Sequence, residues 1–122
     1  MAALRDHEIR EVNKSNFMDS HLLRFRESEW VGNKWSSIDI EPNDVNYFPR
    51  ILFHLSATYH FPHPQVICAP GGYIAKFEVL GSKAAMHLDT WTFSIAFETR
   101  DVREQVIAML RALPSHYFEI TH

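Results

Sequence analysis

The stretch AAMHLDTWTFSIAFETRDVREQVIAMLRALPSHYFEI, residues 84–120, decides the fold class of this chain. Its first half alternates between polar and apolar residues, which is typical of a half-buried strand and predicts one long strand over 84–98. Its second half repeats apolar residues at helical spacing from Asp101 until Pro114 ends the pattern. A final strand is predicted over 117–121. A strand period followed by a helix period indicates a mixed α and β domain.

A predicted hairpin precedes this stretch. Residues 73–80 alternate like a strand, and a loop rich in turn residues follows them. A three-residue loop over 81–83 places Phe77 opposite His87 and aligns the apolar faces of the two strands. We therefore expect His87 and Asp89 to lie on the apolar side of the sheet.

The N-terminal half contains further elements. Two strand-like runs, 21–31 and 34–41, flank Gly32-Asn33, which is a signal for a two-residue hairpin turn. A helix is predicted over 44–60, because its apolar residues recur on one face and the following FPHP disfavours helix. A short buried strand is predicted over 65–69.

The order of these elements predicts the architecture. Two strands, a helix, three strands, a helix and a strand suggest a mostly antiparallel sheet with two helices packed on one face. We expect a single α+β domain over residues 1–122, in which residues 1–20 form either a short helix or a partly disordered segment.

Composition narrows the class of protein. A chain of 122 residues fits one domain. The chain has a formal net charge of −3, and its sequence lacks the clustered basic residues that are typical of a nucleic-acid-binding surface. No apolar run reaches the length of a membrane span. The single cysteine, Cys68, cannot form an internal disulfide, so we expect a reducing cytoplasm, with Cys68 as an inert core residue and Trp91 also in the core.

The eight histidines do not predict a metal site. His54, His60 and His63 come nearest to a ligand cluster, but the spacing of the first two puts them on different faces of a helix. No cysteine or carboxylate completes a zinc pattern. We expect no metal and no cofactor.

His87 and Asp89 form a possible catalytic pair. They are two residues apart on a strand, so their side chains share one side. With Tyr73 they would line a pocket between sheet and helix, in which the carboxylate tunes the imidazole as a general base. The other interpretation is an exposed, hydrogen-bonded pair near a sheet edge. The first interpretation supports a small enzyme or ligand-binding domain.

An acidic, aromatic surface is the main candidate site. Trp30 and Trp35 flank the predicted turn, where they either serve as binding hot spots or pack against each other across the hairpin. Carboxylates cluster on and just after the same hairpin. Such a face would attract a basic partner, although it can also be a solvated strand face. The predicted partner-binding residues are Glu27, Glu29, Trp30, Trp35, Asp39, Glu41 and Asp44.

In its small size, mild acidity, three tryptophans and lack of a catalytic motif, the chain resembles the small toxin-immunity proteins of bacteria. The resemblance assigns no individual residue. It implies a cytoplasmic binding protein that covers the active cleft of a cognate toxin, such as a nuclease, without catalytic residues, nucleic-acid contacts or membrane contacts. A third possibility is a structural subunit that adds a strand to a partner sheet or forms a homodimer through an exposed edge.

Overall fold

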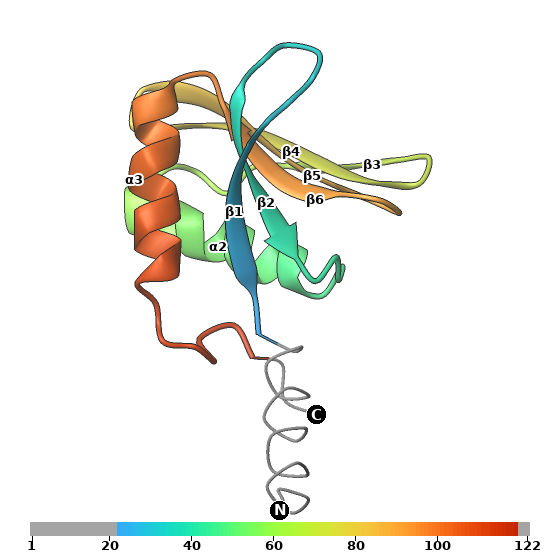
Figure 1. The fold of residues 1–122 in the computed structure, drawn as a ribbon. Coiled ribbons are helices and arrows are strands. Elements are labelled where there is room, and N and C mark those ends of the chain that lie inside the picture. Colours follow the sequence, from blue (N-terminus) through green and yellow to red (C-terminus); the bar gives the residue numbers. More distant parts are fainter. Residues whose placement is uncertain (1–21, 120–122) are drawn as a thin grey trace, which may run out of the picture.

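The computed structural model describes residues 22–119, which form a six-stranded antiparallel sheet and two helices (Figure 1). The strands follow the order β1-β2-β6-β5-β4-β3 across the sheet. The elements are β1 (Arg24–Glu29), β2 (Ser36–Glu41), α2 (Tyr47–Tyr59), β3 (Val66–Ala69), β4 (Gly72–Val79), β5 (Ser82–Asp89), β6 (Phe93–Phe97) and α3 (Arg100–Arg111). The predicted α+β class is confirmed. The expectation for residues 1–20 lies outside the described residues.

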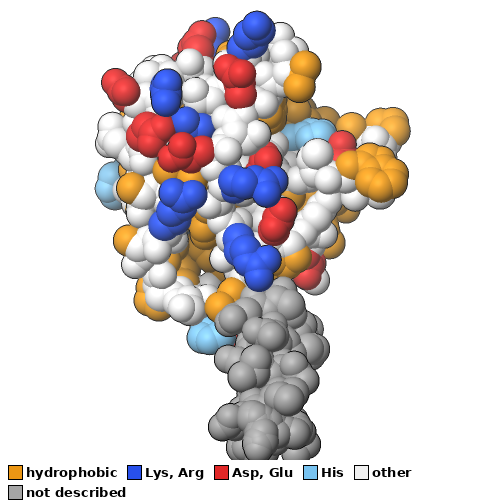
Figure 2. Space-filling view, viewed as in Figure 1, with side chains coloured by type: hydrophobic (Ala, Val, Ile, Leu, Met, Phe, Trp, Pro, Cys, Tyr) orange, Lys and Arg blue, Asp and Glu red, His pale blue; other side chains and the backbone are white. Residues whose placement is uncertain are grey.

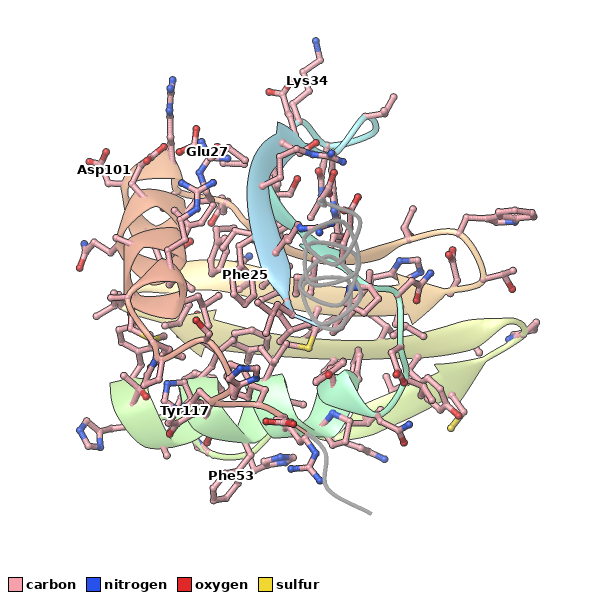
Figure 3. All side chains as sticks on the ribbon, turned by 60° about the horizontal axis from the view of Figure 1, so that its bottom comes forward. Phe25, Glu27, Lys34, Phe53, Asp101 and Tyr117 are labelled. Atoms are coloured by element: carbon pink, nitrogen blue, oxygen red, sulfur yellow. The ribbon has the colours of Figure 1, made fainter. Side chains whose placement is uncertain are left out.

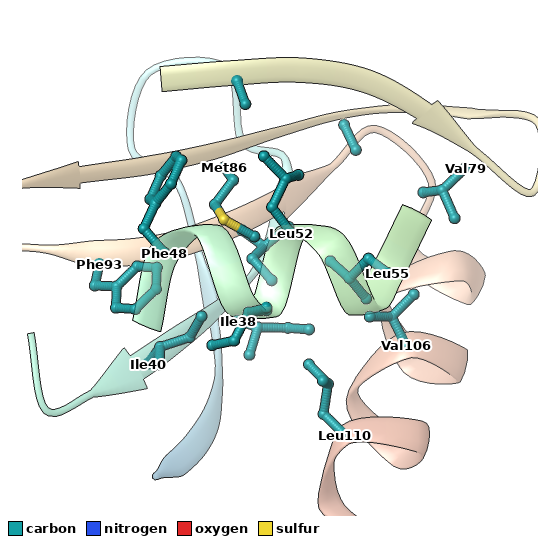
Figure 4. Packing of buried hydrophobic residues seen from close by; sticks show 14 of the residues in the cluster. Ile38, Ile40, Phe48, Leu52, Leu55, Val79, Met86, Phe93, Val106 and Leu110 are labelled. Carbon is teal, nitrogen blue, oxygen red and sulfur yellow. The ribbon is translucent and has the colours of Figure 1, made fainter. Parts of the chain in front are cut away.

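The hydrophobic core lies between the two helices and one face of the sheet, which we call the helix face. Ile38, Met86 and Ile95 come from three adjacent strands and are completely buried. Leu52 from α2 and Val106 from α3 pack in the same cluster (Figure 4). Full burial stabilises each such side chain by about 1.5–3 kcal/mol. The core therefore fixes both helices on one side of the sheet.

The opposite face of the sheet carries no helix among residues 22–119, and we call it the open face. Residues directly opposite each other on antiparallel strands point to the same side. The strand register places Asp39 opposite Ser94, Ser94 opposite His87, and His87 opposite Ile74. These residues form one row across the middle of the open face.

The long strand predicted over 84–98 is instead two strands joined by a tight turn. Asp89 ends β5, and its Oδ1 accepts hydrogen bonds from the backbone N–H groups of Trp91 and Thr92, each at 2.8 Å. An aspartate that bonds the backbone two residues ahead is a turn-forming arrangement. The expectation that Trp91 is a core residue is also wrong, because it lies on this turn and is 85 % exposed.

The predicted register of the β4–β5 hairpin is wrong as well. The turn has two residues, Leu80 and Gly81, whose φ angles are 52° and 80°. Two consecutive positive φ values belong to the tight turns that join twisted antiparallel strands. Phe77 consequently lies opposite Ala84 rather than His87. This change of register moves His87 from the predicted apolar side to the open face.

The first hairpin closes with a longer loop than predicted. Trp30 and Trp35 face each other across it, and the N–H of Trp30 donates to the carbonyl oxygen of Trp35 at 2.9 Å. The loop therefore spans residues 31–34, and Lys34, with a φ of 61°, takes the left-handed conformation. The predicted two-residue turn at Gly32-Asn33 gives the same register, with Trp30 opposite Trp35, so only the length of the loop differs from the prediction.

The C-terminal segment packs on α2 without forming the strand predicted over 117–121. Residues 115–118 are turns, and residues 120 and 121 lie outside the described range. Phe118 is 8 % exposed, and the Tyr117 hydroxyl lies 3.1 Å from His54 Nδ1 (Figure 3). The aromatic side chains of this segment thus pack against His54 of α2, and Phe118 also belongs to the hydrophobic core.

Candidate functional site: the open face of the sheet

Two tryptophans form the aromatic part of the open face. The rings of Trp30 and Trp35 are stacked, with centroids 6.3 Å apart and planes 9° apart. Trp30 Nε1 donates a hydrogen bond to Ser94 Oγ at 3.0 Å. Neighbouring positions on the face hold small buried side chains, including Ala85 and Ala96, which leave room for the indoles. The predicted packing of the two indoles across their own hairpin is confirmed, and both remain partly exposed. Their role as binding hot spots stays a prediction.

An imidazole and a carboxylate lie beside the indoles. His87 meets the Trp30 ring edge-on, with centroids 6.4 Å apart, and His87 Nε2 lies 3.7 Å from Asp89 Oδ2. The N–H groups of Trp91 and then Thr92 lower the pKa of the Asp89 carboxyl by bonding its charged form. The side chains are 36 % and 33 % exposed, so this pair is accessible to a partner.

Arg26 changes the electrostatic character predicted for this surface. Its guanidinium lies 3.4 Å from Asp39 Oδ2 and 3.8 Å from Glu41 Oε2. Basic and acidic side chains are also interspersed over β1 and α3 (Figure 2). The open face is consequently mixed in charge rather than uniformly acidic.

The structure divides the predicted partner-binding residues between two sides of the sheet. Successive side chains of a strand point to opposite faces, so Glu27 and Glu29 lie on the helix side of β1. Figure 3 shows Glu27 near α3. Asp44 lies in the loop before α2, where its Oδ1 accepts the N–H of Asn46 at 2.9 Å. The members on the open face are Trp30, Trp35, Asp39 and Glu41.

The alternative pocket of Tyr73, His87 and Asp89 does not assemble. Tyr73 lies opposite Leu88 in the ladder and faces the helices, where its ring centroid is 6.0 Å from that of Phe48. His87 and Asp89 point to the open face. The sheet itself separates the tyrosine from the other two side chains.

The remaining titratable residues are dispersed. Within residues 22–119, no three or more side chains of His, Cys, Asp or Glu gather closely enough to hold a metal ion. Cys68 is exposed on the edge strand β3, so the prediction of a core position was wrong. In the part of the chain that is described, neither helix combines the length and apolar content that crossing a membrane requires.

Sequence reasoning missed a buried arginine that positions the tryptophan hairpin. Arg103 is 4 % exposed, and its Nη1 donates to the carbonyl oxygens of Ser28 at 3.0 Å and Ser37 at 2.9 Å. Its Nη2 donates to Glu104 Oε2 at 2.9 Å. The available signal that this arginine faces inward was its helical spacing to the apolar Ile107 and Leu110, which are four and seven residues further on.

Comparisons with protein families, curated proteins and solved structures give no match for this chain.

Proposed function

We propose that this chain is a binding protein that covers part of another protein with the open face of its sheet, and that it neutralises a cognate toxin in the manner of an immunity protein. The observation that carries the proposal is the partly exposed indole pair of Trp30 and Trp35 on a face without a helix among residues 22–119. The more specific part of the proposal, that the partner is a toxin, rests on the resemblance of this chain in size and composition to small toxin-immunity proteins.

The physical support is that the indoles are already ordered. The Trp30–Ser94 hydrogen bond and the stacking on Trp35 restrict both side chains before any partner arrives. Pre-ordered side chains lose less conformational entropy on binding. Tryptophan and arginine are enriched among the residues that contribute most to protein interfaces, and Arg26 lies on the same face.

Within this surface of mixed charge, the carboxylates offer contacts to basic groups of a partner. Asp39 and Glu41 share one arginine, Arg26, and Asp89 lies farther along the face. Complementary charge accelerates association and selects partners more than it raises affinity. In this mechanism the face occludes a basic substrate cleft, and no bond is made or broken in the partner.

The first experiment isolates the partner and tests the indole pair. The full chain serves as bait in a pull-down from its native host, and binding of the purified partner is then measured with Trp35→Ala. We expect at least a tenfold weaker affinity, since hot-spot truncations cost about 2 kcal/mol or more. Phe53→Ala is the matched control, because Phe53 is 65 % exposed on the far side of α2 (Figure 3). Equal affinities for the two variants would remove the open face from the proposal.

A second experiment tests charge and function together. Asp39→Arg should slow association at low salt, whereas Glu27→Arg, on the other side of β1, should leave the rate nearly unchanged. Co-expression of the chain with the partner then tests neutralisation directly. If the partner binds through the open face but is not toxic to cells, the proposed binding function stands and the proposal that the partner is a toxin is refuted.

A further inference from the structure

The outer edge of β3 is an unusual sheet edge. Nothing within residues 22–119 pairs with that side of the strand, which lies at one margin of the sheet (Figure 1). The four residues of β3 read VICA, without a charge, and Ile67 is 49 % exposed. Uncharged edges of this kind readily pair with another strand. The β1 edge, in contrast, reads RFRESE and carries both signs of charge.

The hairpin geometry determines which backbone groups point outward. Pro70 and Gly71 form a two-residue turn, so Ala69 and Gly72 are a hydrogen-bonded pair. Hydrogen-bonded and non-hydrogen-bonded pairs alternate along an antiparallel ladder. The N–H and C=O groups of Cys68 and Val66 therefore point away from β4 and are available to a further strand.

We propose that two copies of this chain pair through their β3 strands in an antiparallel arrangement, about a two-fold axis that passes beside Ile67. Val66 of each copy then lies opposite Cys68 of the other. Each of these pairs exchanges two hydrogen bonds, so the two pairs give about four bonds between the copies. This surface is separate from the indole pair, and the proposal does not depend on the proposed function.

The strand is suited to itself rather than to a charged partner strand. A two-fold axis places the residue beside it opposite its own copy, so a self-pairing strand must lack a charge at that position. β3 meets this requirement, because all its side chains are uncharged. Antiparallel self-pairing of β1 in the equivalent way would bring like charges together.

The helix side of β3 has room for the side chains of the second strand. A hollow of about 500 Å³ lies between the start of α2 and the β3–β4 edge. Val66 and Tyr73 line it from the sheet, and Val45 and Pro49 line it from the helix side. Val45 is 45 % exposed. The Cys68 side chain of the second copy points to this same side and would cover part of this apolar surface.

Flanking prolines keep the pairing short. Pro64 has no N–H to donate, so it cannot extend the ladder at the next outward-pointing position, and Pro70 lies in the turn. The contact is therefore small, and dimerisation is expected to depend on concentration. Larger, longer-lived association would contradict the short edge described here.

Light scattering of the full chain after size exclusion tests the proposal. We expect the molar mass to rise with concentration from the 14.3 kDa of one chain toward twice that value. Ile67→Lys should hold the mass at that of one chain, because two ammonium groups would lie opposite each other. Leu80→Lys is the control, since Leu80 is similarly exposed, at 48 %, but lies in the turn between β4 and β5, away from the β3 edge.

Directed cross-linking provides a readout that does not depend on affinity. Ile67→Cys combined with Cys68→Ser puts one thiol opposite its own copy at a Cα separation of about 4.5 Å, within the range for a disulfide. Mild oxidation should convert most of this variant to a covalent dimer, while Leu80→Cys with Cys68→Ser should remain reduced. A wild-type chain that stays monomeric, a dimer that survives Ile67→Lys, or equal cross-linking of the two variants would overturn the proposal.

Discussion

Trp30 Nε1 donates a hydrogen bond to Ser94 Oγ across 64 residues of sequence and across strand β2. The bond ties the end of the first hairpin to the central strand β6. It holds one indole over small buried side chains and leaves the second, Trp35, stacked on the first. The orientation of the candidate binding surface therefore depends on one serine hydroxyl.

Two buried serines on the open face provide a matched pair of substitutions. Ser94→Ala removes the acceptor of the Trp30 bond and should lower the free energy of unfolding by about 1 kcal/mol. Ser37→Ala should be neutral or slightly stabilising, because Ser37 Oγ is buried without a hydrogen-bond partner among the described residues. Urea unfolding, followed by tryptophan fluorescence, measures both. A larger loss for Ser37→Ala would contradict this assignment of the two hydroxyls.

Gly72 is required by the close approach of strands β4 and β5. A Cβ at this position would lie 2.0 Å from the carbonyl oxygen of Leu88, and this backbone atom cannot move away independently. Gly72→Ala should therefore destabilise the fold by about 1–3 kcal/mol or more. Gly32→Ala is the control, because a methyl group at Gly32 would meet no described atom within 4 Å. Similar unfolding midpoints in urea for the two variants would refute the steric argument.

Arg103 should contribute more to stability than an exposed arginine on the same helix. Arg103→Met leaves the carbonyl oxygens of Ser28 and Ser37 without its guanidinium, and we expect a loss of about 1–3 kcal/mol. Arg100→Met should change stability by less than about 0.5 kcal/mol, because Arg100 is 77 % exposed. Thermal unfolding compares them. An equally small effect of both substitutions would show that Arg103 does not fasten the hairpin.

His54 should make the stability depend on pH. Burial lowers the pKa of His54 below its usual 6.5 in the folded chain, so the unfolded chain binds a proton more readily. The free energy of unfolding should therefore fall as the pH drops below about 6.5, and the fall should end once the pH is below the lowered pKa of the folded chain. Well above pH 6.5, His54 is neutral in both states and should not make the stability depend on pH. Tyr117 and Thr58, whose hydroxyls lie near the two ring nitrogens, face the same imidazole.

Denaturant titrations between pH 5 and pH 7.5 measure this dependence, with the range set by the ordinary histidine pKa of about 6.5. His54→Gln should reduce the slope of stability against pH in this interval. Phe53→Gln, an exposed neighbour of His54 that carries no titrating group, is the control and should leave the slope unchanged. An unchanged slope in His54→Gln would assign the effect to another histidine.

Repeating patterns in the sequence predicted the elements of the core but not all of their boundaries. Ile38 and Ile40 follow the period of a strand, and Leu52 and Val106 follow that of a helix, and all four are buried where expected. An element that buries one face repeats its apolar residues with the period of its own secondary structure, so a short stretch of sequence is enough to recognise it. The candidate indoles were also identified, because Trp30 and Trp35 flank a turn signal.

The sequence by itself determined the fold class, the two helices and the core faces of those helices, since each depends on residues close together along the chain. Only the tertiary structure decided which side chains meet. A positive φ at Leu80 and a side-chain-capped turn at Asp89 set the strand register, and that register moved His87 to the open face. A shift of one residue reverses every side chain of a strand, so small local energies in turns determine the composition of a surface.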